Sequence, residues 1–135
     1  MSVQHPTVAD FMASHLFTLS PDADIHDAVN FLLENRISGA PVVEGGRLVG
    51  MLSEKDCLRL LTVGAEHSAA NGRVCDFMTK EVTTIRPDMN IYFAAGIFLQ
   101  KPIRRIPVVD EGVLLGQISR RDILRAIKQR QDNRR

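Results

Sequence analysis

The chain has 135 residues, of which 44% are hydrophobic and 24% are charged, and its net charge is +1. This length and composition are typical of a globular protein that buries its own core. The sequence contains no apolar run of roughly 18 residues, which excludes a membrane span. The first residues also lack the basic and apolar regions of a signal peptide, so we expect a cytoplasmic protein.

The chemistry-bearing residues do not predict an enzyme. The two cysteines form neither a disulfide framework nor a metal site, and Cys57 falls in a predicted helix where a small core residue is expected. The four histidines are scattered without metal-ligand spacing. The sequence shows no nucleophile–base pair, Walker loop or metal cluster. We therefore expect no catalytic residues, no bound metal and no catalytic cofactor.

Charge is divided unevenly between the two halves. Residues 1–72 carry 4 Lys/Arg and 9 Asp/Glu, a net charge of 4 − 9 = −5. Residues 73–135 carry 13 Lys/Arg and 7 Asp/Glu, a net charge of 13 − 7 = +6. This asymmetry predicts an anionic partner for the second half or complementary packing of the halves, with unconnected surface variation as the alternative.

The chain repeats itself. A shift of 66 residues aligns residues 8–61 with residues 74–127 without a gap, and 21 of the 54 aligned positions are identical. Chance does not produce such an alignment. Two copies, and not many, indicate a paired unit and not a solenoid.

The elements of the first copy can be read in order. Apolar residues recur at helical spacing over residues 24–35, which predicts an amphipathic helix. Two short apolar runs separated by residues 44–46, Glu-Gly-Gly, predict a β-hairpin. A second helix over about residues 53–62 completes the unit, and we expect it to direct Leu58 and Leu61 inward.

With a short apolar strand at residues 16–19 in front, each copy reads as β-α-β-β-α. We therefore predict an α+β fold in which residues 8–63 form the first repeat and residues 74–130 the second. Residues 64–73 form the linker, and residues 131–135 a flexible C-terminal tail. One copy would have a thin core, so we expect the two to pack with pseudo-two-fold symmetry.

Two features of the second copy depart from the first. Pro102 is predicted to end the first helix of that copy sharply. Gly96 should weaken the same helix by about 1 kcal/mol relative to alanine. Either residue could reflect close packing or the approach of a ligand.

One turn is present in both copies, at Gly50–Asp56 and again at Gly116–Asp122. Its serine and its aspartate three residues later have the spacing of a capping box, in which both side chains satisfy backbone N–H groups at a helix start. The same residues suit a nucleotide, because a carboxylate accepts hydrogen bonds from a ribose diol and a helix start attracts phosphate. Both interpretations can hold at once.

The ordered set of motifs, present twice, resembles a pair of CBS (cystathionine-β-synthase) domains, together called a Bateman module. The resemblance covers nearly the whole chain. Its carriers in the two copies are Asp10-Phe-Met and Asp76-Phe-Met, the Ile-x-x-Ala segments at Ile25 and Ile91, the strands starting at Pro41 and Pro107, and the two Gly-x-x-Ser-x-x-Asp turns.

This resemblance implies that adenine nucleotides (AMP, ADP or ATP), NAD or S-adenosylmethionine bind in the cleft between the repeats, with the two aspartates on the ribose hydroxyls. Both copies keep the aspartate, which permits two sites. The nucleotide-binding residues that it implies are Thr18, Ser38, Gly39, Ala40, Pro41, Ser53 and Asp56 in the first copy, and Thr84, Arg104, Arg105, Ile106, Pro107, Ser119, Arg121 and Asp122 in the second.

We expect the two sites to differ. Guanidinium groups pair with phosphate through two parallel hydrogen bonds, so phosphate-rich ligands should depend on the second copy. The arginines in question are Arg104, Arg105, Arg120 and Arg121, where the first copy has Ser38, Gly39, Glu54 and Lys55.

The function predicted from the sequence is a regulatory, energy-sensing module that binds a nucleotide and signals to a protein partner. The resemblance also implies a homodimer, and the opposite charges of the halves favour a head-to-tail arrangement. Two alternatives remain at this point. One is a ligand-free scaffold, and the other is nucleic-acid binding through the basic second repeat, which the 5% aromatic content disfavours.

Overall fold

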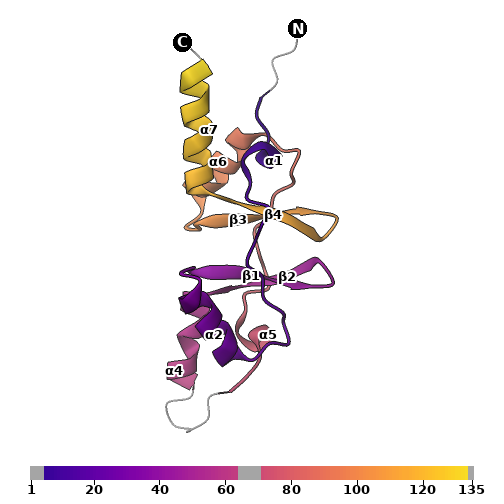
Figure 1. Cartoon of the computed structure of the whole chain (residues 1–135), viewed down its shortest axis with the longest axis vertical. Coiled ribbons are helices and arrows are strands. Elements are labelled where there is room, and N and C mark those ends of the chain that lie inside the picture. Colours follow the sequence, from indigo (N-terminus) through magenta and orange to yellow (C-terminus); the bar gives the residue numbers. More distant parts are fainter. Residues whose placement is uncertain (1–4, 64–70, 134–135) are drawn as a thin grey trace. The chain divides into compact units, whose positions relative to one another are not determined.

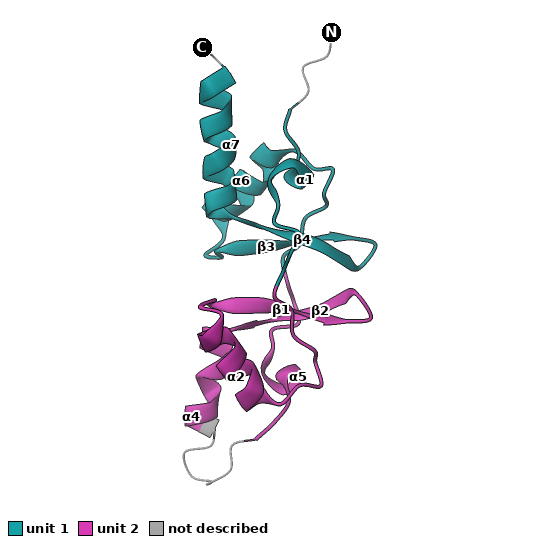
Figure 2. Cartoon of the chain, in the orientation of Figure 1, with its two compact units in different colours: residues 1–16, 83–135 teal, residues 17–82 magenta. Residues whose placement is uncertain are grey.

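The computed structural model describes residues 5–63 and 71–133 (Figure 1). These residues divide into two compact units, which Figure 2 shows in separate colours. Unit 1 consists of residues 5–16 and the chain from residue 83 onward, and unit 2 lies between them in the sequence, over residues 17–82. No helix among the described residues combines the length and the hydropathy needed to cross a membrane.

Each unit is built from one β-hairpin and several helices, so the predicted α+β class is confirmed. The elements of unit 2 are α2 (Ile25–Glu34), β1 (Gly39–Glu44), β2 (Arg47–Ser53), α3 (Glu54–Cys57), α4 (Arg59–Val63) and α5 (Val74–Phe77). Those of unit 1 are α1 (Val8–Phe11), α6 (Ile91–Gln100), β3 (Arg105–Asp110), β4 (Val113–Ser119) and α7 (Arg120–Asn133).

Helix α2 forms where the apolar periodicity predicted it. Its N-cap Asp24 accepts hydrogen bonds from the backbone N–H groups of His26 and Asp27, at 2.8 and 3.3 Å. These bonds satisfy donors that a helix start otherwise leaves without a partner. One face of the helix is buried, through Ile25, Ala28 and Leu32.

The hairpins also form as predicted, and their turns require left-handed backbone. Strands β1 and β2 pair antiparallel around Gly45 and Gly46, whose φ angles are 57° and 79°. In the second hairpin the same positions are Glu111, at φ 50°, and Gly112, at φ 86°. The predicted strand at residues 16–19 is reduced to one parallel bridge, between Leu19 and Val42.

The second helix of unit 2 differs from the prediction. It is divided into α3 and α4 at Leu58, whose N–H donates to the carbonyl of Lys55, three residues back. Leu58 and Leu61, expected inside, are 62% and 77% exposed. Cys57 and Leu60 pack against the core instead. The helix carries two apolar stripes, and the cap at Ser53, which sets where the helix begins, turns the Cys57–Leu60 stripe inward.

The two cores use matching positions. In unit 2 they include Ile25, Ala28, Val42, Leu52 and Val74. In unit 1 they include Ile91, Ala94, Val108, Ile118 and Val8. Each unit therefore completes its core with the short helix that opens the other sequence repeat, α5 in unit 2 and α1 in unit 1.

Backbone hydrogen bonds hold these exchanged segments in place. Val74 donates to the carbonyl of Ala23 at 2.9 Å in unit 2, and Val8 donates to that of Met89 at 2.8 Å in unit 1. The exchange means that the sequence repeat and the packed unit are different divisions of the chain.

Candidate functional site

In unit 2 the structure places the predicted site residues on three neighbouring segments. The cap residue Ser53 ends β2 and pairs with Gly39 at the start of β1. The carbonyl of Ser38 accepts a hydrogen bond from the N–H of Glu54 at 2.9 Å. Thr18 precedes Leu19, whose N–H donates to the carbonyl of Pro41 at 2.9 Å.

Unit 1 repeats this arrangement with the second set of predicted residues. Ser119, at the end of β4, pairs with Arg105 at the start of β3. Thr84 precedes Ile85, whose N–H donates to the carbonyl of Pro107 at 3.1 Å. All of the predicted residues of each copy therefore belong to one unit.

Not every predicted residue can offer its side chain to a ligand. Ala40 and Ile106 are fully buried members of the two cores, so their side chains are not available to a ligand. Arg104 and Arg121 are exposed, and Arg105 is half-buried. Arg120 donates a hydrogen bond to the carbonyl of Ile103 at 3.1 Å, which occupies one end of its guanidinium.

The serine–aspartate turn is a complete capping box in both units. In unit 2, Oδ2 of Asp56 accepts from the backbone N–H of Ser53 at 2.9 Å and from its hydroxyl at 3.0 Å. In unit 1, Oδ2 of Asp122 accepts from the same groups of Ser119 at 2.7 and 3.0 Å. One carboxylate oxygen of each aspartate is thus committed to starting a helix.

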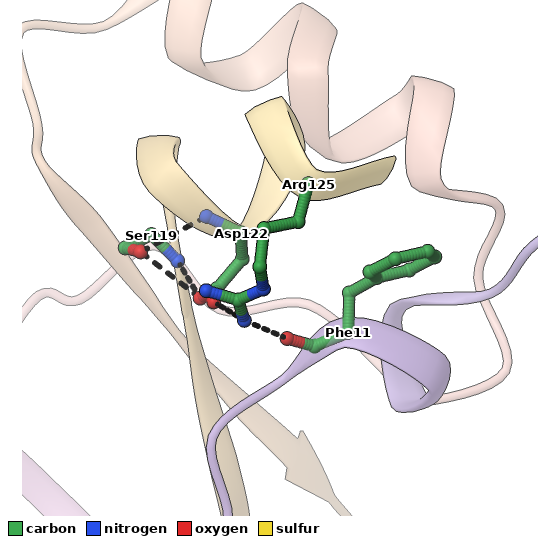
Figure 3. A network of polar contacts seen from close by, with 4 residues as sticks. All are labelled: Phe11, Ser119, Asp122 and Arg125. Atoms are coloured by element: carbon green, nitrogen blue, oxygen red, sulfur yellow. Dashed lines mark hydrogen bonds and ion pairs between the residues drawn. The ribbon is translucent and has the colours of Figure 1, made fainter. Parts of the chain in front are cut away.

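The second carboxylate oxygen has different partners in the two units. Oδ1 of Asp56 accepts a hydrogen bond from the hydroxyl of Thr79 at 3.2 Å. Oδ1 of Asp122 is paired with the guanidinium of Arg125, as Figure 3 shows. Neither Thr79 nor Arg125 was predicted from the sequence as a partner of the aspartates. One signal that the two turns differ was present, because Thr79 aligns with Ala13 and not with another threonine.

The glycine that opens each turn is required by a close approach of the chain. A Cβ atom on Gly50 would lie 2.7 Å from Sδ of Met78 and 2.9 Å from the carbonyl oxygen of Thr79. A Cβ atom on Gly116 would lie 2.7 Å from the carbonyl oxygen of Ala13. The glycines therefore let the exchanged segments pass directly against the turns.

A groove of about 750 Å³ opens beside the unit 2 turn, between α2 and the α3–α4 segment. Ser38 and Glu54 from the turn region line it together with apolar side chains, including Leu33 and Leu58. Cys57 also lines the groove, and burial, followed by the negative charge of Asp56, raises the pKa of its thiol.

Comparisons with known proteins agree with this architecture. The CBS domain family model matches residues 8–63 and 74–129. The CBS domain-containing protein YhcV of Bacillus subtilis is 31% identical over 87% of this chain and 82% of its own length. Inosine-5'-monophosphate dehydrogenase of Nitrosopumilus maritimus is 32% identical over 83% of this chain but only 22% of its own length.

Two solved structures of the CBS-pair protein CBSX2 are similar to the chain. CBSX2 from Arabidopsis thaliana has a TM-score of 0.83 and 31% identity over 96% of this chain and 99% of that one. CBSX2 in complex with AMP has a TM-score of 0.81 and 33% identity, covering 93% of this chain and 98% of that one. The chain therefore belongs to the CBS domain family, as a tandem pair.

Proposed function

We propose that the chain binds an adenine nucleotide at the Ser-x-x-Asp turns and signals its presence to a protein partner by changing shape. AMP is the first candidate, because a relative with 33% identity has been solved with AMP; ADP, ATP and NAD follow. One observation carries the proposal: in both units, Oδ2 of the aspartate accepts the hydrogen bonds of the cap, whereas Oδ1 is paired, among the described residues, with a side chain that a ligand can replace.

The two carboxylate oxygens of each aspartate have different partners, and this explains how a helix cap can also be a binding site. Oδ2 of Asp56 stays on Ser53, so the start of α3 is preserved when a ligand arrives. Oδ1 exchanges the hydroxyl of Thr79 for a ribose hydroxyl, which is a similar hydrogen bond. For a ligand at the Asp122 turn, the positive charges nearest in the same unit's predicted site are those of Arg105 and Arg121, which suit phosphate groups.

The test is calorimetric titration of AMP into variants that keep the cap. In Asp56→Asn and Asp122→Asn, the remaining carbonyl oxygen can still accept from the serine N–H, while the charge that strengthens the ribose bonds is lost. Charge-assisted hydrogen bonds contribute about 1.5–3 kcal/mol, so each change should weaken AMP at its own turn by about tenfold or more.

Asp76→Asn is the matched control. The Asp76 carboxylate also caps a short helix, by accepting from the N–H of Arg73 at 2.8 Å, but it lies in α5 and not in either turn. AMP affinity should not change in this variant. If AMP, ATP and NAD all fail to raise the melting temperature of the wild type, a ligand-free scaffold is the better interpretation.

We further propose that the chain acts as a regulator and not as an enzyme. The match to inosine-5'-monophosphate dehydrogenase covers 22% of that protein, so there the pair is a module attached to a much longer chain. YhcV, by contrast, matches over 82% of its length, as expected of a pair that stands alone. A pair with the extent of YhcV would deliver its signal through contact with another protein.

A second copy of the chain is the proposed assembly partner. Both units expose large apolar side chains at the same three repeat positions, and self-complementary faces of this kind favour a symmetric dimer. The exposed pairs are Leu33 with Leu99, Leu58 with Leu124, and Leu61 with Ile127. Light scattering should give a dimer for the wild type and a monomer for Leu61→Glu. A monomeric wild type at low salt contradicts this proposal.

A further inference from the structure

The two aspartate turns allow a comparison within one chain, because the backbone around them is the same. In unit 2, Met51 and Thr79 exchange backbone hydrogen bonds of 2.9 and 2.8 Å. In unit 1, Gln117 and Ala13 exchange bonds of 2.9 and 2.8 Å. The side chains of Thr79 and Ala13 therefore start from equivalent places, and only unit 2 has a hydroxyl there.

The arginine three residues after each aspartate, Arg59 in unit 2 and Arg125 in unit 1, has different partners in the two units. In unit 2, where Thr79 fills Oδ1 of Asp56, Arg59 donates to the carbonyl of Phe77 and its guanidinium lies 5.3 Å from the centre of the Phe77 ring. In unit 1 the equivalent residue, Ala13, has no hydroxyl, and Arg125 pairs with Oδ1 of Asp122.

Arg125 keeps a second contact in unit 1. It also donates to the carbonyl of Phe11 at 3.4 Å (Figure 3), the repeat equivalent of the bond that Arg59 makes. Its side chain is 57% exposed, so it can leave the carboxylate without disturbing the core, while the Asp122 side chain is 8% exposed. The arginine is therefore the partner that can leave the pair.

Displacing the two Oδ1 partners has different costs. A ribose hydroxyl that reaches Asp56 replaces a neutral hydroxyl, which is an exchange of like for like. A ribose hydroxyl that reaches Asp122 must replace a guanidinium, whose positive charge adds the attraction of an ion pair to the hydrogen bond. A phosphate on the same ligand changes this balance, because it offers the guanidinium another anion.

We propose that Arg125 is a selectivity residue that keeps the Asp122 turn closed to uncharged ribosides and releases it to ligands that carry phosphate. The Asp56 turn, whose arginine is already turned away, accepts both. This inference rests on the proposed nucleotide-binding function and assigns a different ligand preference to each turn. The difference originates at Ala13 and Thr79.

The test compares adenosine with AMP by calorimetry, one turn at a time. With Asp56→Asn as background, the Asp122 turn is the reporter, and Arg125→Met should tighten adenosine about fivefold, as expected for the loss of a competing ion pair. The ratio of AMP to adenosine affinity should fall in the same variant. With Asp122→Asn as background, the matched Arg59→Met change should leave adenosine affinity within about twofold.

Ala13→Thr provides a second variant in which no charge is removed. It supplies the hydroxyl that unit 2 has, so Arg125 should leave Asp122 and adenosine should tighten as in Arg125→Met. This variant decides the question if Arg125→Met does not fold, which circular dichroism will show. The reverse change, Thr79→Ala, should loosen adenosine at Asp56.

The outcomes separate the two proposals. If the wild type binds AMP but the AMP-to-adenosine ratio stays the same in Arg125→Met and Ala13→Thr, the role of Arg125 is wrong and the nucleotide-binding function stands. If neither the wild type nor any variant binds AMP or adenosine, both proposals are wrong. Tighter adenosine in both variants, with no change in Arg59→Met, supports the selectivity role.

Discussion

Replacing glycine by alanine at two places in unit 1 should change stability in opposite directions. At Gly116 the added Cβ would lie 2.7 Å from the carbonyl oxygen of Ala13 and 2.7 Å from Sδ of Met12. The Met12 side chain can move, but the Ala13 oxygen accepts the N–H of Gln117 at 2.9 Å and cannot retreat without lengthening that bond. Overpacking of this kind costs about 1–3 kcal/mol.

At Gly96, in the interior of α6, an added Cβ meets no atom within 4 Å. Close packing therefore does not explain this glycine. Alanine should stabilise the helix by about 1 kcal/mol, because glycine loses more backbone entropy on folding. The pair Gly116→Ala and Gly96→Ala thus adds the same methyl group with opposite expected signs.

Urea denaturation followed by circular dichroism measures both changes. With an m-value of about 2 kcal/mol/M, the midpoint should fall by about 0.5–1.5 M for Gly116→Ala and rise by about 0.5 M for Gly96→Ala. An unchanged midpoint for Gly116→Ala, or a lower one for Gly96→Ala, would refute the reasoning from contact distances.

Three further predictions concern single side chains. In a Cys75→Ser background, the alkylation rate of Cys57 should have its pH midpoint above the ordinary 9.0, since burial raises the thiol pKa; a lower midpoint contradicts this. Asp24→Ala removes the N-cap of α2 and should lower the free energy of unfolding by about 1 kcal/mol in urea; no change would count against the cap. The hydrogen bond from Arg86 lowers the pKa of Asp88. This exposed pair stabilises the fold above the ordinary carboxyl pKa and less as pH falls through the lowered value, so the NMR titration midpoint of Asp88 should shift up in Arg86→Gln.

Local features were predictable because neighbouring residues determine them. The position of α2, the glycines of the first hairpin and the serine–aspartate boxes depend on spacings of a few residues, and all form as expected. The orientation of Leu58 and Leu61 was not predictable in this way. Helical periodicity identifies an apolar stripe, but a helix with two such stripes does not reveal which one faces its own core.

The different Oδ1 partners of the two aspartates could not be predicted from neighbouring residues, for another reason. Arg59 and Arg125 are identical in the repeat alignment, and so are their aspartates. The two turns differ in the residue that lies beside the aspartate, which is Thr79 in unit 2 and Ala13 in unit 1. Ala13 is far from Asp122 in sequence, although it forms backbone hydrogen bonds with Gln117. Only the folded chain brings the deciding side chain to the carboxylate.

The exchange of α1 and α5 between repeats has a consequence for how the chain folds as it is made. Unit 2 consists of one continuous stretch and can close soon after residue 82 leaves the ribosome. Residues 5–16 are synthesised before unit 2, yet the strand they pair with, β4, begins at Val113. Residues 5–16 must therefore wait until β4 has been synthesised, and this long-range closure should be the slow step of folding.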